Sequence, residues 1–222
     1  HGAVLQYGTM VEQILPQRDG TVKVRTSTEE YDAAKVILSA GPWVRSFLSE
    51  KWHNIFQPTR QVLHWLDIET DHQAAWENSP AFAWPHGEKP DDFFYGMPSL
   101  AAAHQFKMAS EFYGAPTAPE ETNRDVSKAE QDAFYARHPQ NRLLGLNPNV
   151  VRSATCLYTA APDGHFIMDD HPEMKNVFLV SACSGHGFKH SAAIGEMLAQ
   201  LMTKGETSFD ISPFSMSRFS VA

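Results

Sequence analysis

The chain has 222 residues, 42% of them apolar, and a formal net charge of -8 at pH 7 with histidine neutral. This apolar fraction is enough for a packed core and argues against disorder, and the length suits one large domain or two small ones. Lysine and arginine are scattered without a run, which argues against a nucleic-acid partner. No apolar stretch approaches the ~20 residues that a membrane-spanning helix needs.

The number of cysteines bears on the redox compartment of the protein, and the first residues bear on whether the chain is part of a longer protein. Cys156 and Cys183 are too few for a disulfide framework, and a reducing cytoplasm fits them. The chain begins His1-Gly2-Ala3, without a methionine and without the charged and apolar regions of a signal peptide. Because it opens inside a strand-like pattern, we expect a fragment of a longer protein.

The first part of the chain is expected to be rich in strands. Asp19-Gly20 marks a turn between two strand-like segments, the second of which alternates polar and apolar residues. A later apolar segment runs into Gly41-Pro42-Trp43, which predicts a strand, a glycine turn and a helix that ends near Leu48. The expected strands of this part are residues 4–15, 21–26, 29–32 and 35–40.

The middle of the chain predicts mostly antiparallel strands. Ser127, with Glu130 three residues later, forms a capping box that predicts a helix through about Arg137. Residues 71–89 are expected to be irregular, and residues 161–164 form a turn signal. The expected strands of this part are residues 61–68, 93–96, 104–112, 150–159 and 166–168.

The segment SACSGHGFKHSAAIGEMLAQLM, residues 181–202, follows a short apolar strand at residues 177–180. Gly185 and Gly187 flank a histidine, and apolar residues then recur at helical spacing from Ile194 to Leu201. A strand, a glycine turn and a helix offer free N–H groups and a positive helix end to an anion or an electron-rich ring, and glycine lets a ligand approach the backbone. An ordinary connection that uses glycine for a turn is the other interpretation.

Three motifs, taken with their order and spacing, identify a family. They are Cys156-Leu157-Tyr158-Thr159, Asp163-Gly164-His165-Phe166-Ile167 and Ser184-Gly185-His186-Gly187-Phe188-Lys189. Together they resemble the monomeric sarcosine oxidase and N-methyltryptophan oxidase family of flavoprotein amine oxidases. Residues 36–43 resemble the family's second flavin-domain strand and turn, and residues 95–99 and Lys107 fall in the expected order between the motifs.

The resemblance implies a fold that is α/β plus α+β. The C-terminal portions of a layered FAD-binding domain, residues 1–56 and 163–222, would surround a mostly antiparallel-sheet substrate domain, residues 57–162. Family members are longer and begin with a βαβ unit whose G-x-G-x-x-G motif holds the pyrophosphate of FAD. This chain contains no such motif, and the family's substrate-binding arginine would also lie in that missing part.

Two residues depart from the family pattern. Glu111 stands where a histidine often follows four residues after the catalytic lysine, and Cys183 stands where bulkier aromatic residues are common. Both departures bear on which amine the protein accepts.

The resemblance implies a covalent FAD linked through a thioether to Cys156. A thiolate is a good nucleophile toward the flavin methyl group, and its reactivity depends on a lowered pKa and on access; a buried cysteine acting as a small hydrophobe is the alternative. Lys107 would lie over the flavin and stabilise developing superoxide by its charge, although a solvated surface lysine is the more usual reading of such a residue.

The remaining implied site residues bind substrate or contact the cofactor. Lys189 would pair with the substrate carboxylate from the first turn of a helix, where a lysine is otherwise unfavourable. Tyr95 and Tyr158 would line the substrate cavity, with core packing as the alternative. The residues implied to contact the cofactor, besides Cys156, are Val11, Gly41, Trp43, Gly185, His186, Gly187, Phe188 and Lys189.

The implied activity is FAD-dependent oxidation of a secondary amine, an N-methyl amino acid such as sarcosine or N-methyltryptophan, with O₂ as acceptor and imine or aldehyde and hydrogen peroxide as products. A catalytically inactive fragment that binds no flavin is a second possibility, and a cysteine hydrolase using Cys183 and His186 is a third, for which no orienting group is evident.

The histidines lack metal-binding spacing, so no metal site is expected. Asp169-Asp170 is expected to form a cap or a turn. No membrane partner is expected.

Overall fold

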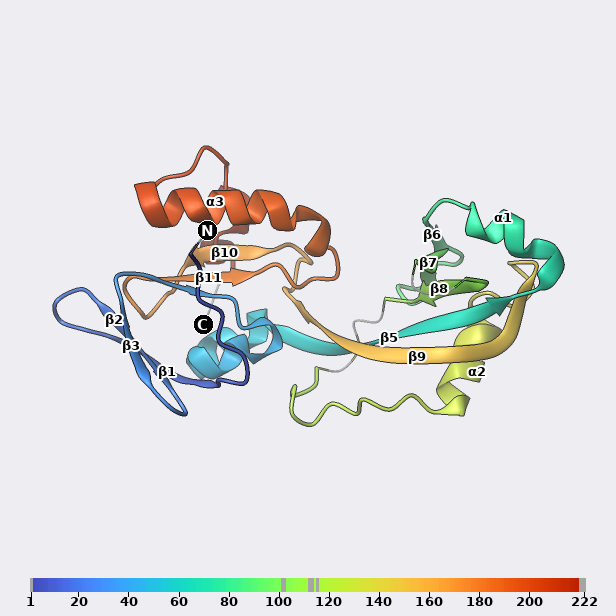
Figure 1. Cartoon of the computed structure of the whole chain (residues 1–222), viewed down its shortest axis with the longest axis horizontal. Helices are drawn as coiled ribbons and strands as arrows, with labels where there is room; N and C mark the ends of the chain where they lie inside the picture. Colours follow the sequence, from blue (N-terminus) through green and yellow to red (C-terminus); the bar gives the residue numbers. More distant parts are fainter. Residues whose placement is uncertain (1, 101–102, 112–113, 115, 220–222) are drawn as a thin grey trace. The chain divides into compact units, whose positions relative to one another are not determined.

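The computed structural model describes residues 2–100, 103–111, 114 and 116–219 (Figure 1). The chain forms two compact units, one made of His1–Gln57 and Thr159–Ala222 and the other of Pro58–Tyr158. Among the described residues, no helix combines the length and the apolar character that crossing a bilayer requires. The same residues contain no group of three or more His, Cys, Asp or Glu side chains arranged to hold a metal ion.

The first unit contains two three-stranded sheets. One is antiparallel, with β1 (Val11–Pro16), β2 (Val22–Thr26) and β3 (Glu30–Ala33) in that order. In the other, β11 (Val177–Ser181) lies between β10 (Ile167–Asp170), its antiparallel partner, and β4 (Val36–Leu38), its parallel partner. The helix α3 (Ser191–Lys204) completes the unit.

Strand β11 is buried along its whole length because both of its faces are covered. Val177 and Leu179 belong to the core that also contains Ile14 and Val22 of the antiparallel sheet. Phe178 and Val180 belong to a second core, against which α3 packs. The unit is therefore layered, with α3 on one face of the β10-β11-β4 sheet and the β1-β2-β3 sheet on the other (Figure 1).

Helix α3 follows the apolar spacing of its sequence. Met197 is buried, and Ile194, Leu198 and Leu201 pack beside it against the sheet. The helix ends at Gly205, which adopts the left-handed conformation with φ +82° and donates its N–H to the carbonyl of Leu201. Glycine is the usual residue at such a helix end because it has no Cβ to clash there.

Two predicted elements of this unit are shorter or tighter than the sequence suggests. The strand expected at residues 4–15 begins only at Val11, and Gly8 before it has φ +67°, outside the extended region. The helix expected after Gly41 is the 3₁₀ helix η1 (Gly41–Phe47), with Pro42 in its first turn, and it is followed by η2 (Glu50–Ile55). Shorter 3₁₀ turns are η4 (Phe188–His190), η5 (Ser212–Phe214) and η6 (Met216–Arg218).

The second unit is built on one five-stranded sheet. Its order is β6 (Phe82–Pro85), β7 (Phe93–Pro98), β8 (Gln105–Ala109), β5 (Gln57–Ile68) and β9 (Leu146–Ala160). The pairs β6-β7, β7-β8 and β8-β5 are antiparallel, as the sequence predicts. Two helices, α1 (Gln73–Glu77) and α2 (Lys128–Arg137), and the 3₁₀ turn η3 (Thr70–His72) join these strands.

One face of this sheet forms the core of the unit. Leu66, Phe94, Phe106 and Met108 lie on it and pack with Phe134 of α2. Their full burial removes large apolar side chains from water, at about 1.5–3 kcal/mol for each.

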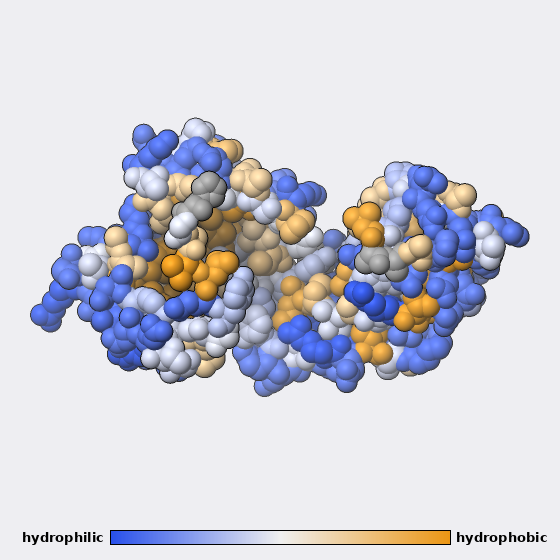
Figure 2. Space-filling view, viewed as in Figure 1, coloured by the Kyte–Doolittle hydropathy of each residue, from blue (hydrophilic) through white to orange (hydrophobic). Residues whose placement is uncertain are grey.

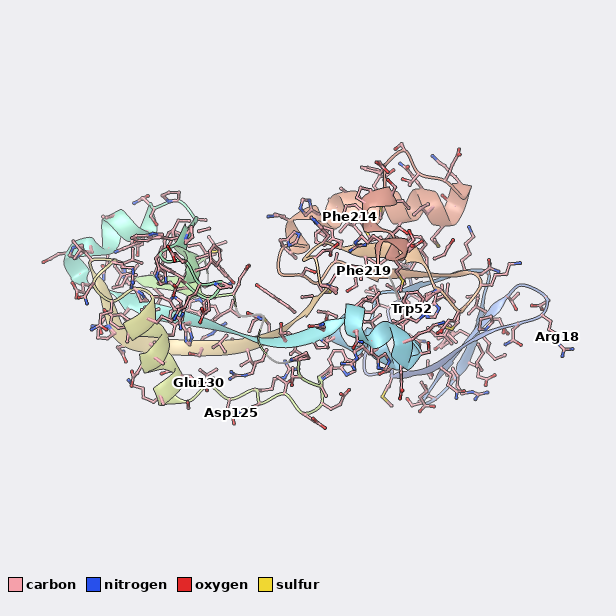
Figure 3. The ribbon with its side chains drawn as sticks, turned by 180° about the vertical axis from the view of Figure 1, so that it is seen from behind. Arg18, Trp52, Asp125, Glu130, Phe214 and Phe219 are labelled. Atoms are coloured by element: carbon pink, nitrogen blue, oxygen red, sulfur yellow. The ribbon has the colours of Figure 1, made fainter. Side chains whose placement is uncertain are left out.

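A polar clamp holds α2 to the sheet. The Arg60 guanidinium of β5 lies 2.7 Å from a carboxylate oxygen of Glu130, and it donates to the carbonyls of Asn123 and Asp125 at 2.8 Å each. Figure 3 labels Glu130 and Asp125, which come from α2 and from the segment leading into it.

Residues 71–89 are more regular than expected, since they contain η3, α1 and the edge strand β6. Pro85 ends β6, and proline suits an edge strand because it lacks the N–H that an inner strand would need. The strand expected at residues 104–112 covers Gln105–Ala109, and Phe112 lies outside the described residues.

Candidate functional site

The sheet face of the second unit that points away from α2 carries several of the predicted site residues. Lys107 of β8 lies opposite Trp65 of β5 and opposite Met97 of β7, and Tyr95 lies opposite Ala109. Alternate residues of a strand share a face, and the intervening Phe106 and Met108 belong to the core on the α2 side. Lys107 and Tyr95 therefore lie on the same face.

Strand β9 adds residues to this face. The Arg152 guanidinium carbon lies 4.1 Å from the centroid of the Trp65 ring, and the Lys107 ammonium lies 5.7 Å from it. The next residue, Ser153, contacts His64, whose ring packs on Phe134 of α2. The alternation along β9 then places Cys156 and Tyr158 on the same side as Arg152.

Cys156 is half-buried, and its thiol interacts with two cations. Burial raises the pKa of the Cys156 thiol, while the charges of Lys107 and Arg124 act in the opposite direction. The net shift is upward, whereas a reactive cysteine calls for a lowered pKa. The structure thus places both positive charges within electrostatic reach of the sulfur, but burial outweighs their effect on the pKa of the thiol.

The phenol groups of Tyr95 and Tyr158 act on each other electrostatically. Burial raises the pKa of each phenol, and the upward shift is large for Tyr158, where Tyr95 adds to it. The charge of Glu111 acts on both tyrosines in the same direction. Both phenols therefore stay protonated at neutral pH and serve as neutral hydrogen-bonding groups.

The first unit brings its predicted turns to one edge of a sheet. β4 and β11 are parallel, with Leu38 opposite Leu179, so the segments that follow both strands leave at the same edge. This is the edge where open α/β sheets bind ligands. Gly41 follows β4 with φ +54°, and Gly185 follows β11 with φ +88°.

The turn after β11 is tightly built. A Cβ at Gly187 would lie 1.8 Å from the carbonyl oxygen of Ala182, so only glycine fits there without a backbone shift. The Ser184 hydroxyl contacts the carbonyl of His165 at 3.3 Å and the N–H of Ala161 at 3.4 Å. These contacts hold the turn against the segment that joins β9 to β10.

The remaining residues of this edge are accessible. Phe188 is 93% exposed and Trp43 is 44% exposed, and Lys189 is exposed as well. Lys189 lies in η4, one turn before α3, and not in the first turn of that helix as predicted. Figure 2 shows apolar atoms on the surface of this unit, which also exposes Ile37.

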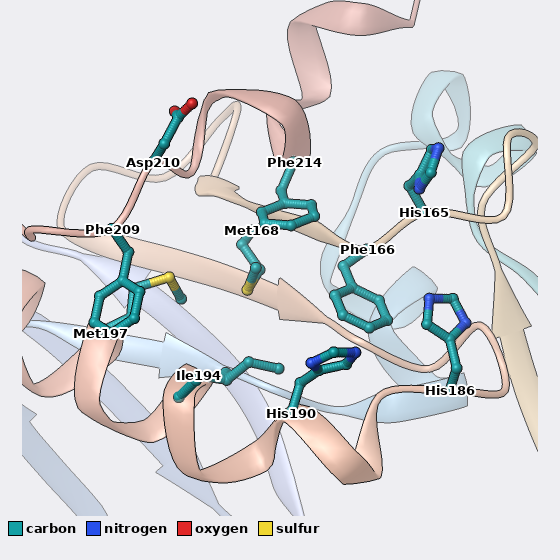
Figure 4. Close-up of a pocket in the computed structure, with 11 residues that line it drawn as sticks. His165, Phe166, Met168, His186, His190, Ile194, Met197, Phe209, Asp210 and Phe214 are labelled. Atoms are coloured by element: carbon teal, nitrogen blue, oxygen red, sulfur yellow. The ribbon is translucent and has the colours of Figure 1, made fainter.

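His186 faces a cavity of about 300 Å³ within the first unit (Figure 4). Its ring stacks on Phe166 with centroids 4.6 Å apart, and its Nδ1 lies 3.0 Å from the carbonyl of Ser184. Within the described part of the chain, no hydrogen bond joins His186 to Cys183, and burial raises the pKa of the Cys183 thiol. These observations favour a packing role for His186 and weigh against a cysteine hydrolase.

All predicted site residues except Val11 fall into two groups. Tyr95, Lys107, Cys156 and Tyr158 share one face of the sheet in the second unit. Gly41, Trp43 and residues 185–189 follow the two parallel strands of the first unit. Val11 belongs to β1, opposite Thr26 in the other sheet of that unit, and 39% of it is exposed.

Sequence reasoning missed Trp65 and Arg152 as neighbours of Lys107. Trp65 is 9% exposed and lies in a predicted strand, but only the register of β5 with β8 shows that it faces Lys107. Arg152 comes from a distant segment, and the sequence offers no signal for its position.

Residues 1–201 match the model of the DAO family, described as FAD dependent oxidoreductase. Monomeric sarcosine oxidase from Bacillus sp. (strain NS-129) is 34% identical over 220 residues, which are 98% of this chain and 56% of that protein. N-methyl-L-tryptophan oxidase from Salmonella dublin is 34% identical over 204 residues, 91% of this chain and 52% of that protein. The chain spans about half the length of the curated relatives it matches.

Solved structures show the same fold at lower identity. NikD, described as an unusual amino acid oxidase essential for nikkomycin biosynthesis, superposes with a TM-score of 0.76 at 22% identity and covers 96% of this chain and 56% of its own. Glycine oxidase from Geobacillus kaustophilus superposes with a TM-score of 0.70 at 19% identity. The match covers 99% of this chain and 54% of the glycine oxidase chain. With the family model matched along most of its length, the chain belongs to the DAO family of FAD-dependent oxidoreductases.

Proposed function

We propose that the protein containing this chain oxidises a secondary amine, an N-methyl amino acid, with FAD as cofactor and O₂ as electron acceptor. The overall reaction converts the N-methyl amine, O₂ and water into a primary amine, formaldehyde and hydrogen peroxide. The observation that carries this proposal is the single sheet face that holds Cys156, Lys107 and the Tyr95–Tyr158 pair. The similarity to sarcosine and N-methyltryptophan oxidases supports it.

The residues of this face suit a flavin ring. Cys156 supplies the only thiol of the second unit, and a thioether at that position would fix the ring beside Lys107. The positive charges of Lys107 and Arg124 partly offset the burial that raises the thiol pKa, and such offsetting favours the thiolate that forms the bond. Bound FAD supplies the two-electron acceptor for amine oxidation and passes the electrons on to O₂.

The lysine and tyrosine side chains of the chain would then have distinct roles in the reaction. The Lys107 ammonium would stabilise the negative charge that develops on O₂, an electrostatic contribution that needs no proton transfer. Lys189 would bind the substrate carboxylate, because it is exposed beside the glycine turn. The protonated phenols of Tyr95 and Tyr158 would border the amine and help to exclude water from it.

The attachment of FAD is the step to test first. We expect wild-type protein to keep its yellow colour in an acid precipitate and to gain the mass of one FAD on a peptide that contains Cys156. Cys156→Ala should lose both signals. Cys183→Ala is the matched control, because Cys183 is also a free, partly buried thiol, and it should keep them.

The outcome separates this proposal from its rivals. Colourless protein of unmodified mass and intact fold would favour a form that binds no flavin, and FAD that stays with Cys156→Ala after acid treatment would place the linkage elsewhere. Two free cysteines and no disulfide among the described residues are consistent with a reducing cytoplasm, the location that we propose.

A further inference from the structure

Trp65 lies between two positively charged side chains that come from the strands on either side of it. β5 lies between β8 and β9 in the sheet, and Lys107 belongs to β8 while Arg152 belongs to β9. The Arg152 guanidinium carbon is 4.1 Å from the centroid of the indole ring, and the Lys107 ammonium is 5.7 Å from it. The indole therefore connects a lysine and an arginine whose strands do not pair with each other.

The two contacts with the ring differ in tightness. At 4.1 Å the Arg152 guanidinium touches the indole, and arginine suits such a contact because its charged group is planar and weakly hydrated. At 5.7 Å the Lys107 ammonium is close to the outer limit of about 6 Å for a cation–π contact. Arg152 thus holds the ring, while Lys107 is guided by it and stays available to a negative charge that develops nearby.

The backbone that carries Arg152 is anchored from the other face of the sheet. The hydroxyl of Ser153, the next residue, lies 3.0 Å from Nδ1 of His64 and accepts a hydrogen bond from the side chain of Gln131 at 3.1 Å. His64 is buried and directly precedes Trp65 in β5. Although Arg152 itself is exposed, its strand cannot slide past Trp65 without breaking these contacts, so the place of the guanidinium on the ring is built into the sheet.

We propose that Arg152 is a positioning residue for the reaction with O₂, because it fixes the Trp65 indole that keeps the Lys107 ammonium in place. This inference rests on the proposed amine oxidation and adds to it a residue that acts only through Lys107. In the reaction concerned, O₂ takes up two electrons from the reduced cofactor and two protons, and becomes hydrogen peroxide. Without Arg152 the indole is free to turn toward β9, and the ammonium then loses the surface that limits its position.

Arg152→Met in the full-length, flavin-containing protein tests this role, since it removes the charged planar group and keeps an unbranched side chain. After photochemical reduction of the flavin, the reaction with O₂ should slow by about 3- to 10-fold, the size expected when one cation–π contact is lost. Anaerobic reduction by sarcosine should change less than about twofold. Arg18→Met, which removes an exposed arginine between β1 and β2, is the control and should leave both rates unchanged.

A double-mutant cycle shows whether Arg152 acts through the lysine. If it does, adding Arg152→Met to Lys107→Met should slow the reaction with O₂ no further than Lys107→Met alone. A direct effect of the Arg152 charge on oxygen, or a general loss of structure, would instead slow the double variant further.

Nuclear magnetic resonance supplies a readout that needs neither substrate nor turnover. Reductive ¹³C-methylation keeps the charge of each lysine and gives it a methyl signal, and the signal of Lys107 is the one that Lys107→Met removes. The ring current of Trp65 should displace this signal in otherwise wild-type protein. Arg152→Met should move it toward the position of an exposed lysine such as Lys128.

Four outcomes would each overturn the inference: equal slowing of the two reactions in Arg152→Met, an unchanged rate with O₂, further slowing in the double variant, or an unmoved Lys107 signal. Absence of flavin on Cys156 would instead overturn the proposed function. The Lys107 signal would then still decide whether Arg152 positions the lysine, because that measurement does not depend on the cofactor.

Discussion

Lys107 and Trp65 lie opposite each other on β8 and β5, and the Lys107 ammonium is 5.7 Å from the centroid of the indole ring. Trp65 is 9% exposed, so its ring is held by the surrounding structure and gives Lys107 a fixed surface to lie on. The Arg152 guanidinium contacts the same ring at 4.1 Å. A lysine held in this way has less freedom to lose when it acts on a ligand, which suits a group that works by position and charge.

Replacing Lys107 tests this role. We expect Lys107→Met in the full-length protein to slow the reaction of the reduced enzyme with O₂ by about 10²–10³-fold, because the charge that stabilises reduced oxygen is lost. Reduction by the amine under anaerobic conditions should change far less, and stopped-flow absorbance of each half-reaction separates the two rates.

The control for this variant is Lys128→Met, which removes a lysine whose side chain is 70% exposed on α2. It should leave both half-reactions unchanged. A similar decrease in the rates of both half-reactions in Lys107→Met would show that Lys107 positions the cofactor and does not act on oxygen.

Most strands could be predicted because their burial alternates or is continuous. β11 is apolar throughout and buried throughout, and the capping box at Ser127 is present with both of its hydrogen bonds, to and from Glu130. The short elements α1 and β6 were missed, since five and four residues carry too little periodicity to be distinguished from a loop.

The sequence predicts a site residue only where that residue belongs to a recognisable family motif. Cys156, Lys107 and Tyr158 came from a family resemblance, whereas the partners of these residues depend on strand register. The spacing along the chain does not show that Trp65 lies opposite Lys107 or that Tyr95 and Tyr158 act on each other. The relation of the site residues of one unit to those of the other stays a prediction.

Stability of the second unit should depend on pH through two buried histidines. His64 is 2% exposed and His138 is 3% exposed, and burial lowers the pKa of each to about 4, with the neighbouring His86 adding to the effect at His138. Each histidine binds its proton more readily in the unfolded chain, where the pKa is 6.5. The unfolded state therefore takes up more protons as the pH falls, and the folded state loses stability.

We expect the free energy of unfolding to be constant above about pH 7.5 and to fall between about pH 6.5 and pH 4, by at most about 1.4 kcal/mol per pH unit for each histidine. Urea unfolding followed by tryptophan fluorescence between pH 8 and pH 4.5 measures this slope. His64→Asn should reduce the slope by about half, while His104→Asn, at an exposed position with φ 61°, should not. An unchanged slope in His64→Asn would contradict the assignment.

The Glu130 carboxylate takes part both in the capping box with Ser127 and in the ion pair with Arg60. Ser127→Ala should destabilise the second unit by about 1 kcal/mol, the usual cost of a lost N-cap. Glu130→Ala should cost more, about 2–4 kcal/mol, because it also removes the contact at 2.7 Å to Arg60, a charged and partly buried partner.

Urea unfolding at pH 7.5 compares these variants with Lys128→Ala, which lies in the same helical turn and is exposed. Lys128→Ala should change the free energy of unfolding by less than about 0.5 kcal/mol. Equal effects of Ser127→Ala and Glu130→Ala would show that the contact between Arg60 and Glu130 contributes nothing measurable.

Gly187 and Gly195 provide a matched pair for the turn after β11. A Cβ at Gly187 would lie 1.8 Å from the carbonyl oxygen of Ala182, whereas a Cβ at Gly195, inside α3, would have no atom within 4 Å. Gly195→Ala should therefore stabilise the protein by about 0.5–1 kcal/mol through its helix propensity. Gly187→Ala should destabilise it by about 2 kcal/mol or more, because the backbone must move.

Thermal unfolding followed by circular dichroism measures whether each of the two variants is more or less stable than wild type. In the flavin-containing protein, Gly187→Ala should also shift the visible absorbance of the cofactor, since the family resemblance implies that the turn which it deforms contacts the cofactor, and Gly195→Ala should leave that spectrum unchanged. A destabilised Gly187→Ala protein with an unaltered flavin spectrum would confirm the tight turn and separate it from the cofactor site.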